Sequence, residues 1–242
     1  THHGTGDWSG RIVSLLPVTW VQDWPIPGEV LPQNIGTMKW DGKIPFKHTE
    51  KLSIKRSDDF DEDCLAPQWQ WNYQPRKDYF SLTERPGWLR LKAYRPLETN
   101  NLLKAGNTLT QRTFRKQNND VTIKMDISNM QDGQKNGLCH FSSQHSAIGI
   151  VKEEDACYLE YRKNGNITKG IQIHSEFVWF RTEWGMDGKS QYYYSLDGDN
   201  FLPFGEKYQL TWGNYRGDRI GIYCFNDKKE TGSVDVDYCH YR

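Results

Sequence analysis

The stretch Asp120–Ile127, which reads DVTIKMDI, decides the fold because polar and apolar side chains alternate through all of its positions. Successive side chains of a β-strand point to opposite faces, so this period of two predicts a strand with one face in a core and the other in water. The stretch Trp88–Tyr94, WLRLKAY, has the same period. These segments predict a chain built from half-buried strands.

Further short strand-like runs continue to the C-terminus, at Cys157–Arg162, Gly170–His174, Val178–Trp184, Gln191–Leu196, Tyr208–Trp212, Ile220–Phe225 and Val234–Tyr241. Glycine-containing turn signals separate several of them, as at Asn164-Gly165, Asp187-Gly188 and Asp197-Gly198. No segment predicts a long helix, and parallel strands need crossover connections that are usually helical. The sequence therefore predicts an all-β protein with an antiparallel β-sandwich, or jelly roll.

Residues 1–50 lack the regular alternation of the rest of the chain and are rich in proline. Prolines interrupt this segment at Pro17, Pro25, Pro27, Pro32 and Pro45. Its one apolar stretch, Ile12–Val21, has room for one or two strands, which form no stable core alone. We therefore predict a leader at residues 1–50 and the sandwich at residues 51–242.

The composition narrows the range of partners. The chain has 242 residues, and its 31 Lys and Arg residues balance 31 Asp and Glu residues, so net charge gives no reason to expect nucleic acid or an anionic membrane as partner. No apolar run is long enough to predict a membrane-spanning helix. The sequence begins at Thr1 without Met or a signal peptide, so secreted, periplasmic and cytoplasmic locations all stay open.

The five cysteines are odd in number and have no C-x-x-C spacing, which argues against a zinc site and against a disulfide framework. Most of them have aromatic or aliphatic neighbours in the sequence. We therefore expect buried free thiols at Cys64, Cys139, Cys157, Cys224 and Cys239.

Several motifs of the chain occur together in one known protein family. The leader segments are HGTGDWSGR at His3–Arg11, LPVTW at Leu16–Trp20 and WPI at Trp24–Ile26. They resemble the last blade of the five-bladed β-propeller of glycoside hydrolase family 43. The remainder resembles the family's C-terminal concanavalin A-like sandwich. The matching pieces occur in order at Asp58–Phe60, Trp69–Asn72, Arg85–Leu91, Leu109–Arg112, Gly137-Leu138, Tyr194–Gly198 and Val234–Tyr238.

The resemblance implies the C-terminal part of a xylan-degrading β-xylosidase or α-L-arabinofuranosidase with an inverting mechanism. Inverting hydrolysis needs two carboxyl groups about 6.5–9.5 Å apart. In the family these groups come from earlier propeller blades, and Asp7 is the only carboxylate in the leader motif. We therefore expect no catalytic residue in this chain, no hydrolase activity from this chain alone, and no organic cofactor.

The same resemblance makes three residues candidates for the sugar pocket of the parent enzyme. His3 matches a family histidine near the propeller axis, where a hydrated calcium ion often sits below the sugar. Arg11 resembles the arginine that faces the sugar and the acid carboxylate, although a polar residue at a blade turn is the simpler alternative for both. Arg219 stands where family xylosidases have an aromatic residue that closes the pocket, and this departure leaves arabinofuranosidase activity open.

Aromatic side chains are the candidates for binding xylan or xylo-oligosaccharides, because the C–H groups of a pyranose stack on Trp and Tyr rings. The chain holds 10 Trp and 13 Tyr, and in any sandwich most such rings fill the core instead. Alternation puts Trp179 on the opposite strand face from Trp184, so that Trp179 faces water. Tyr193 likewise opposes Tyr192. The carbohydrate-binding candidates are therefore Trp71, Trp88, Trp179 and Tyr193.

A structural calcium ion is a further possibility. Asp58 and Asp59 lie at the first predicted strand, and Asp235 and Asp237 lie at the last. If the ends of the sandwich pair, these hard oxygen ligands would come together and suit Ca²⁺. The alternative is four acidic side chains that are simply solvated at strand ends.

Three functional interpretations follow. The first is an accessory, xylan-binding portion of a glycosidase whose propeller part belongs to the same enzyme. The second is a free-standing carbohydrate-binding module, which leaves the leader motif unexplained. The third is a purely structural sandwich that stabilises the propeller and binds no sugar.

Overall fold

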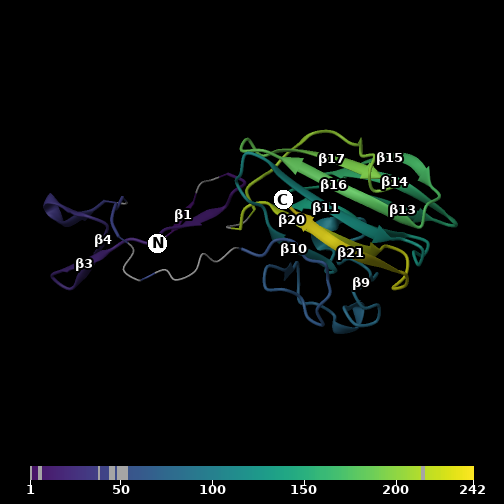
Figure 1. Cartoon of the computed structure of the whole chain (residues 1–242), viewed down its shortest axis with the longest axis horizontal. Helices are drawn as coiled ribbons and strands as arrows, with labels where there is room; N and C mark the ends of the chain where they lie inside the picture. The colour runs from purple at the N-terminus through teal and green to yellow at the C-terminus, as the bar shows by residue number, and fades with distance from the viewer. Residues whose placement is uncertain (1, 5–6, 38, 44–46, 48–53, 214–215) are drawn as a thin grey trace. The chain divides into compact units, whose positions relative to one another are not determined.

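The computed structural model describes residues 2–4, 7–37, 39–43, 47, 54–213 and 216–242. These residues form two compact units (Figure 1). The smaller unit comprises Thr1–Thr5 and Arg11–Ile54, and the larger comprises Gly6–Gly10 and Lys55–Arg242. None of the helices in the described ranges is long and apolar enough to cross a membrane.

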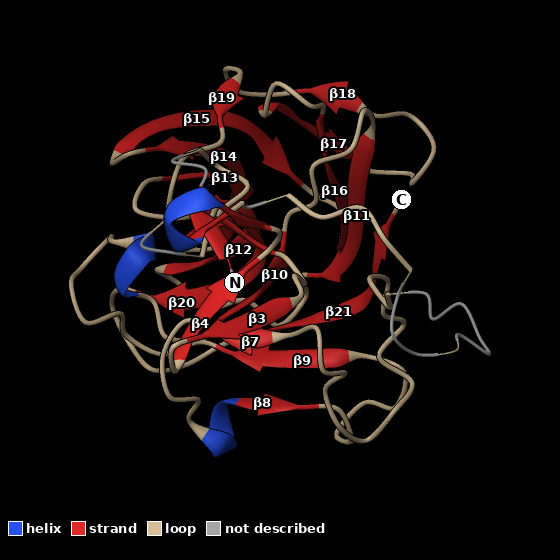
Figure 2. Cartoon of the chain, turned by 90° about the vertical axis from the view of Figure 1, so that its left-hand side faces the viewer, coloured by secondary structure: helices blue, strands red, loops and turns tan. Residues whose placement is uncertain are grey.

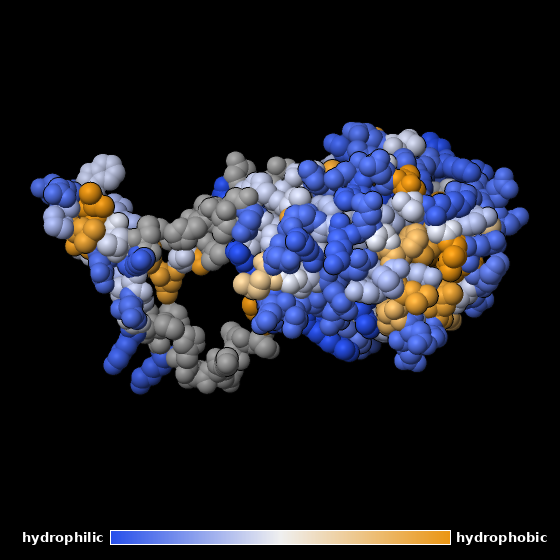
Figure 3. All heavy atoms as spheres, turned by 90° about the horizontal axis from the view of Figure 1, so that it is seen from above, coloured by the Kyte–Doolittle hydropathy of each residue, from blue (hydrophilic) through white to orange (hydrophobic). Residues whose placement is uncertain are grey.

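The smaller unit consists of short antiparallel strand pairs. These are β1 (His2–Gly4) with β2 (Arg11–Val13), β3 (Val18–Val21) with β4 (Trp24–Pro27), and β5 (Val30–Leu31) with β6 (Ile35–Gly36), the last two strands joined by the 3₁₀ turn η1 (Pro32–Asn34). Large apolar side chains are exposed here, including Val13, Trp20 and Trp24, and Figure 3 shows orange, apolar side chains on this surface. The described side chains of this unit therefore build no buried core of their own.

The larger unit is a sandwich of two antiparallel sheets (Figure 2). The seven-stranded sheet has the order β15 (Asn166–Ile173), β14 (Ala156–Lys163), β13 (His145–Glu153), β12 (Gln134–Phe141), β20 (Arg219–Asn226), β10 (Thr108–Arg112), β7 (Gln70–Trp71). The eight-stranded sheet has the order β18 (Leu202–Pro203), β17 (Lys189–Ser195), β16 (Phe177–Trp184), β11 (Asn119–Asp126), β21 (Ser233–Tyr241), β9 (Leu89–Lys92), β8 (Phe80–Ser81), and β19 (Tyr208–Gln209) also pairs with β17. Two 3₁₀ turns, η2 (Lys77–Tyr79) and η3 (Leu102–Lys104), complete the unit. The antiparallel sandwich predicted from alternation is confirmed.

One hydrophobic core lies between the two sheets. Val121, Ile123 and Met125 of β11 are fully buried, as the alternation in Asp120–Ile127 predicts. They share this core with side chains of the opposite sheet, such as Leu138 of β12. Burial of these apolar side chains contributes the main favourable free energy of folding.

The centre of the seven-stranded sheet is buried on both of its faces. Strands β12 and β13 are covered on the inner side by the main core and on the outer side by a second cluster, which includes Cys139, Tyr223 and Leu102 of η3. Strands buried on two faces lose the alternation of polar and apolar residues. The sequences of β12 and β13 therefore carry no alternation that predicts a strand.

Residues near the N-terminus contribute to the sandwich unit. Trp8 is 5% exposed and belongs to the main core, and the backbone N–H of Asp218 donates to the Trp8 carbonyl at 2.7 Å. Gly217 has φ +76°, and a Cβ on it would lie 2.6 Å from the same carbonyl oxygen. A side chain at Gly217 is therefore excluded by both its dihedral angle and its space.

All five cysteines are free. Cys139, Cys224 and Cys239 are buried and Cys157 is half-buried, as expected for structural thiols. The expectation is wrong for Cys64, which is exposed in the loop that precedes Trp69.

Candidate functional site

The outer face of the eight-stranded sheet carries the aromatic side chains of interest. On β16, Val178 and Phe180 point into the core and are fully buried, whereas Trp179 points outward and is half-buried. Trp184, on the inner face, is 3% exposed. The facing of both tryptophans is the one that alternation predicts.

Three aromatic rings surround Lys124 of β11 on this outer face. Its Nζ lies 5.2 Å from the ring centroid of Trp88, 5.3 Å from that of Phe177 and 5.7 Å from that of Trp179. The indole N–H of Trp179 donates to the Tyr238 hydroxyl at 3.1 Å. We call Trp88, Phe177, Trp179 and Tyr238 the aromatic face. Cations next to aromatic rings hold such a cluster in place on a wet surface.

Strand β21 extends this surface through His240. The rings of Tyr238 and His240 stack at a centroid distance of 4.0 Å, and His240 Nε2 lies 2.7 Å from an oxygen of Asp59. A register shift between β11 and β21, at Lys124/Met125, inserts one extra residue in β21. Because of this bulge, Tyr238 faces outward although Val236, two residues earlier, faces the core.

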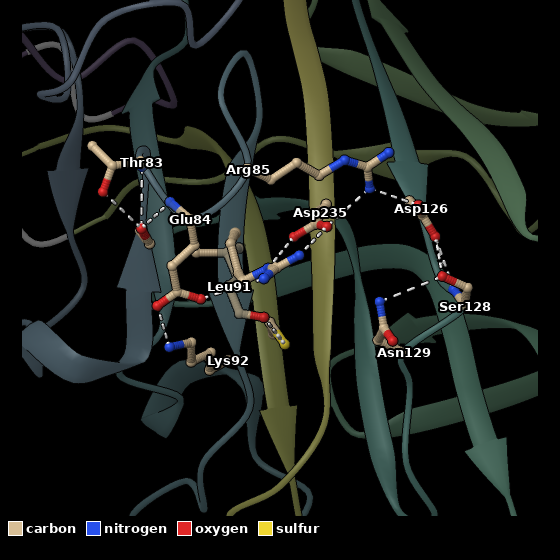
Figure 4. Close-up of polar contacts among 12 residues, drawn as sticks. Thr83, Glu84, Arg85, Leu91, Lys92, Asp126, Ser128, Asn129 and Asp235 are labelled. Carbon is tan, nitrogen blue, oxygen red and sulfur yellow. Dashed lines mark hydrogen bonds and ion pairs between the residues drawn. The ribbon is translucent and has the colours of Figure 1, made fainter.

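A charged network lies beside the aromatic face, and Figure 4 shows Arg85 between Asp126 and Asp235 in it. Asp235 is 1% exposed and accepts hydrogen bonds from Arg90 at 2.7 and 2.8 Å and from Arg85 at 2.9 Å. Arg85 also donates to Asp126 at 2.7 Å, and its guanidinium carbon lies 3.8 Å from the Trp88 ring centroid. Two anchored carboxylates therefore hold Arg85 against one side of Trp88.

The ionisation of this network follows from the same contacts. Hydrogen bonds to Asp235 raise the pKa of Arg90 above its ordinary value. Burial acts to raise the pKa of Asp126, but hydrogen bonds from Ser128 and Arg85 outweigh it and leave that pKa lowered. Arg90 and Asp126 are therefore both charged at neutral pH.

Tyr193 and Trp71, the other sequence candidates, lie elsewhere. Tyr193 of β17 faces outward next to Arg181 of β16 and lines a groove of about 770 Å³ together with Asp120 and Glu183. Trp71 of β7 belongs to the seven-stranded sheet and packs half-buried against the main core, with its ring centroid 4.7 Å from that of Phe80. The structure thus brings Trp88 and Trp179 together, places Tyr193 on the neighbouring strand, and separates Trp71 from them.

The four aspartates considered for calcium have other partners. Asp58 accepts a hydrogen bond from the Trp69 indole at 2.7 Å, and Asp237 pairs with Lys124 at 2.7 Å. Asp59 lies within hydrogen-bond distance of His240. Asp235 accepts the hydrogen bonds of Arg85 and Arg90. A calcium ion needs about six to eight oxygen ligands, and in the part of the chain described no three His, Cys, Asp or Glu side chains gather as a metal site. These residues do not fit a shared calcium ion.

The candidates for a parent sugar pocket fall on three strands. His3 is in β1, opposite Ile12, but its side chain lies outside the described residues. Arg11 is half-buried in β2. Arg219 begins β20, is 7% exposed, and donates from Nε to the Thr110 hydroxyl at 2.7 Å.

The sequence relates the larger unit to a known domain. Residues 57–242 match the family model of the β-xylosidase C-terminal concanavalin A-like domain. The chain therefore belongs to glycoside hydrolase family 43. Residues 57–242 are therefore a C-terminal concanavalin A-like accessory domain of the family 43 type, as the sequence motifs indicate.

Relatives of the family 43 chain are longer proteins. A β-xylosidase of Formosa agariphila is 35% identical over 253 residues, covering 96% of this chain and 43% of the relative. A putative β-xylosidase of Xylanibacter ruminicola is 31% identical over 215 residues, covering 88% of this chain and 39% of the relative. The solved structure of a bifunctional GH43-CE protein of Bacteroides eggerthii, 27% identical, superposes with a TM-score of 0.78 over 98% of this chain and 31% of that one. The chain thus spans less than half the length of each.

Sequence reasoning missed part of the aromatic face of this family 43 domain. Phe177 precedes Val178 by one residue, so the alternation of β16 already indicates that it faces outward. Tyr238 gives no such signal, because the bulge reverses the facing that the period of two predicts.

Proposed function

We propose that the aromatic face binds xylan or xylo-oligosaccharides for a xylan-degrading glycosidase. The observation that carries this proposal is the pair of half-buried indoles, Trp88 and Trp179, whose ring centroids lie 5.2 and 5.7 Å from Lys124 Nζ. Flat rings offer stacking surfaces to pyranose units, and a lysine beside them donates hydrogen bonds to sugar hydroxyls. Tyr193, one strand further along the same face, extends the surface for a chain of sugars.

We further infer that the parent enzyme removes terminal xylosyl or arabinofuranosyl units by inversion, with its catalytic carboxylates in a propeller part of the same protein. The names of two relatives, a β-xylosidase and a putative β-xylosidase, support the xylosyl part of this inference. In the same proposal, residues 1–50 contribute to the last propeller blade. Their short strand pairs with exposed Trp20 and Trp24 are the type of surface that is buried against further blades. His3 and Arg11 keep their proposed places near the sugar pocket.

Calorimetric titration with xylohexaose tests the binding proposal. We expect Trp179→Ala and Trp88→Ala each to weaken binding about tenfold, because losing ring contact removes roughly 1–1.5 kcal/mol. Tyr158→Ala is the matched control, since Tyr158 is a half-buried ring on the outer face of the other sheet. No heat with xylohexaose, together with no retention on insoluble xylan, would reject the aromatic face as a xylan-binding site.

Two further measurements bear on the rest of the proposal. The chain alone should release no nitrophenol from nitrophenyl xyloside or arabinofuranoside, and release would show that catalytic groups are present in it.

Calcium is left out of the proposal, because Asp235 is already bound by Arg85 and Arg90. A melting temperature that falls with EDTA and recovers with calcium would show that the chain does bind a structural calcium ion.

A further inference from the structure

A second hollow lies on the opposite side of the sandwich, at the outer face of the seven-stranded sheet. It has a volume of about 450 Å³, and its lining includes Tyr73, Lys104, Phe141, Arg216 and Arg219. We call it the arginine pocket. Its size is within the range of pockets that hold small ligands.

The described lining of the arginine pocket is cationic. Lys104, Arg216 and Arg219 contribute positive charge, and no Asp or Glu is among the described lining residues. Other hollows of the sandwich carry acids, such as Asp120 and Glu183 in the groove beside Tyr193. The positive charge is therefore a local property, since the whole chain has a net charge of zero.

Arg219 is the residue that distinguishes this pocket from a patch of surface charge. It is 7% exposed, and its hydrogen bonds go to the hydroxyl and carbonyl of Thr110, at 2.7 and 3.3 Å. These neutral acceptors orient the guanidinium without neutralising it. In the described part of the chain no carboxylate forms an ion pair with Arg219 or Arg216, although Lys104 has Glu98 at 3.7 Å.

The surroundings of Arg219 make the binding of an anion beside it more favourable. Arg112 lies directly opposite it in the ladder between β10 and β20. Burial, followed by the charges of Arg216 and Arg112, lowers the pKa of Arg219 to about 10. A buried cation without a counter-ion is unfavourable, and a bound oxyanion would remove that penalty.

The apolar part of the lining indicates what kind of anion fits. Tyr73 is 41% exposed, and Phe141 is half-buried at the end of β12. Aromatic rings beside a guanidinium suit a ligand with both a C–H face and a planar carboxylate. A hexuronic acid has both features, whereas a neutral sugar lacks the charge and a simple inorganic anion lacks the face.

We propose that the arginine pocket binds the carboxylate of a uronic acid, with Arg219 as the principal ligand and Arg216 as the second. The proposal rests on the proposed function only in taking a glycan as the ligand. The uronic acid is either a free sugar or a substituent on a polysaccharide. The pocket is on the sheet opposite the aromatic face, so the two sites are separable by mutation.

Calorimetric titration with sodium D-glucuronate tests this site, with D-glucose as the neutral counterpart and sodium acetate as the sugar-free carboxylate. We expect glucuronate to bind at least tenfold more tightly than either, and to weaken as salt is added. Arg219→Gln should weaken binding at least tenfold and Arg216→Gln several-fold, while Arg95→Gln, an exposed arginine outside the pocket, should leave it unchanged. Equal affinity for glucose or acetate would overturn the assignment.

Further measurements check that the variants fold and identify the source of the uronic acid. Circular dichroism checks that Arg219→Gln folds. If it does not fold, Arg216→Gln and the salt dependence of binding still test whether the arginine pocket binds glucuronate. A glucuronate-substituted xylo-oligosaccharide that binds more tightly than free glucuronate, and loses this advantage in Arg219→Gln, would identify a polysaccharide substituent, and equal binding would identify the free sugar. Xylohexaose binding should be weakened about tenfold in Trp179→Ala and unchanged in Arg219→Gln. Failure of xylohexaose alone would therefore reject the aromatic face and leave the arginine pocket standing.

Discussion

At the scale of single residues, burial sets which side chains ionise. His145 of β13 is 7% exposed, and its Nδ1 is buried without a hydrogen-bond partner among the described atoms. Burial, aided by the charge of Arg162, lowers its pKa to about 4. The folded chain therefore holds this imidazole neutral at pH values where an unfolded chain would protonate it.

This gives a pH dependence with a definite sign. Since the folded pKa of His145 is below the unfolded value of about 6.5, its contribution to stability is complete above pH 6.5 and is lost as pH falls toward 4. We expect the free energy of unfolding to drop by about 2 kcal/mol more between pH 7.5 and 5 in the wild type than in His145→Gln. Urea denaturation at both pH values measures this. The exposed His174→Gln should behave like wild type, and an unaltered pH slope in His145→Gln would refute the assignment.

At the scale of elements, two of the tight turns next to strands of the seven-stranded sheet depend on glycine. Gly217 and Gly165 both have positive φ, +76° and +89°. A Cβ on Gly217 would also lie 2.7 Å from the Gly10 nitrogen, whereas nothing lies within 4 Å of a Cβ on Gly165. The two glycines therefore separate the effect of backbone dihedral angle from the effect of space.

Alanine substitutions at these glycines measure that difference. Gly165→Ala should destabilise the protein by about 1 kcal/mol, from the left-handed dihedral alone. Gly217→Ala should cost about 2–3 kcal/mol, because the methyl group also displaces packed backbone. Chemical denaturation of both variants gives the comparison. Equal losses would show that the close packing around Gly217 has no energetic role.

Elements also show how far the sequence could predict this structure. Strands with one wet face, such as β11 and β16, keep their alternation, so their bounds and the facing of Trp179 follow from the residues. Strands β12 and β13 have no wet face and lose that signal. The bulge in β21, the arginines on Asp235 and the surroundings of Arg219 depend on contacts between distant segments, which no local pattern encodes.

At the scale of the whole molecule, the sandwich includes a residue from far outside the matched domain. Trp8 is 5% exposed in the main core, although the family match begins at residue 57. Trp20, in the smaller unit, is 68% exposed. The two tryptophans therefore contrast a core position with a surface position within the N-terminal segment.

Truncation of these side chains should have very different consequences. We expect Trp8→Ala to lower the free energy of unfolding by about 3–5 kcal/mol, and Trp20→Ala to change it by less than about 0.5 kcal/mol. A fragment of residues 55–242 should lose stability as Trp8→Ala does. Thermal and urea denaturation of the three proteins gives the answer, and a fragment as stable as the whole chain would mean that the Trp8 contact is dispensable.

The central claim is that sugar chains bind on the aromatic face, and NMR of the tryptophan indoles tests it most directly. Xylohexaose should shift the side-chain N–H signals of Trp88 and Trp179, while that of Trp69, which is buried and bonded to Asp58, should stay in place. The Trp179 signal should respond strongly, because its N–H donates to the Tyr238 hydroxyl at the same surface. Unchanged Trp88 and Trp179 signals at saturating xylohexaose would contradict the claim.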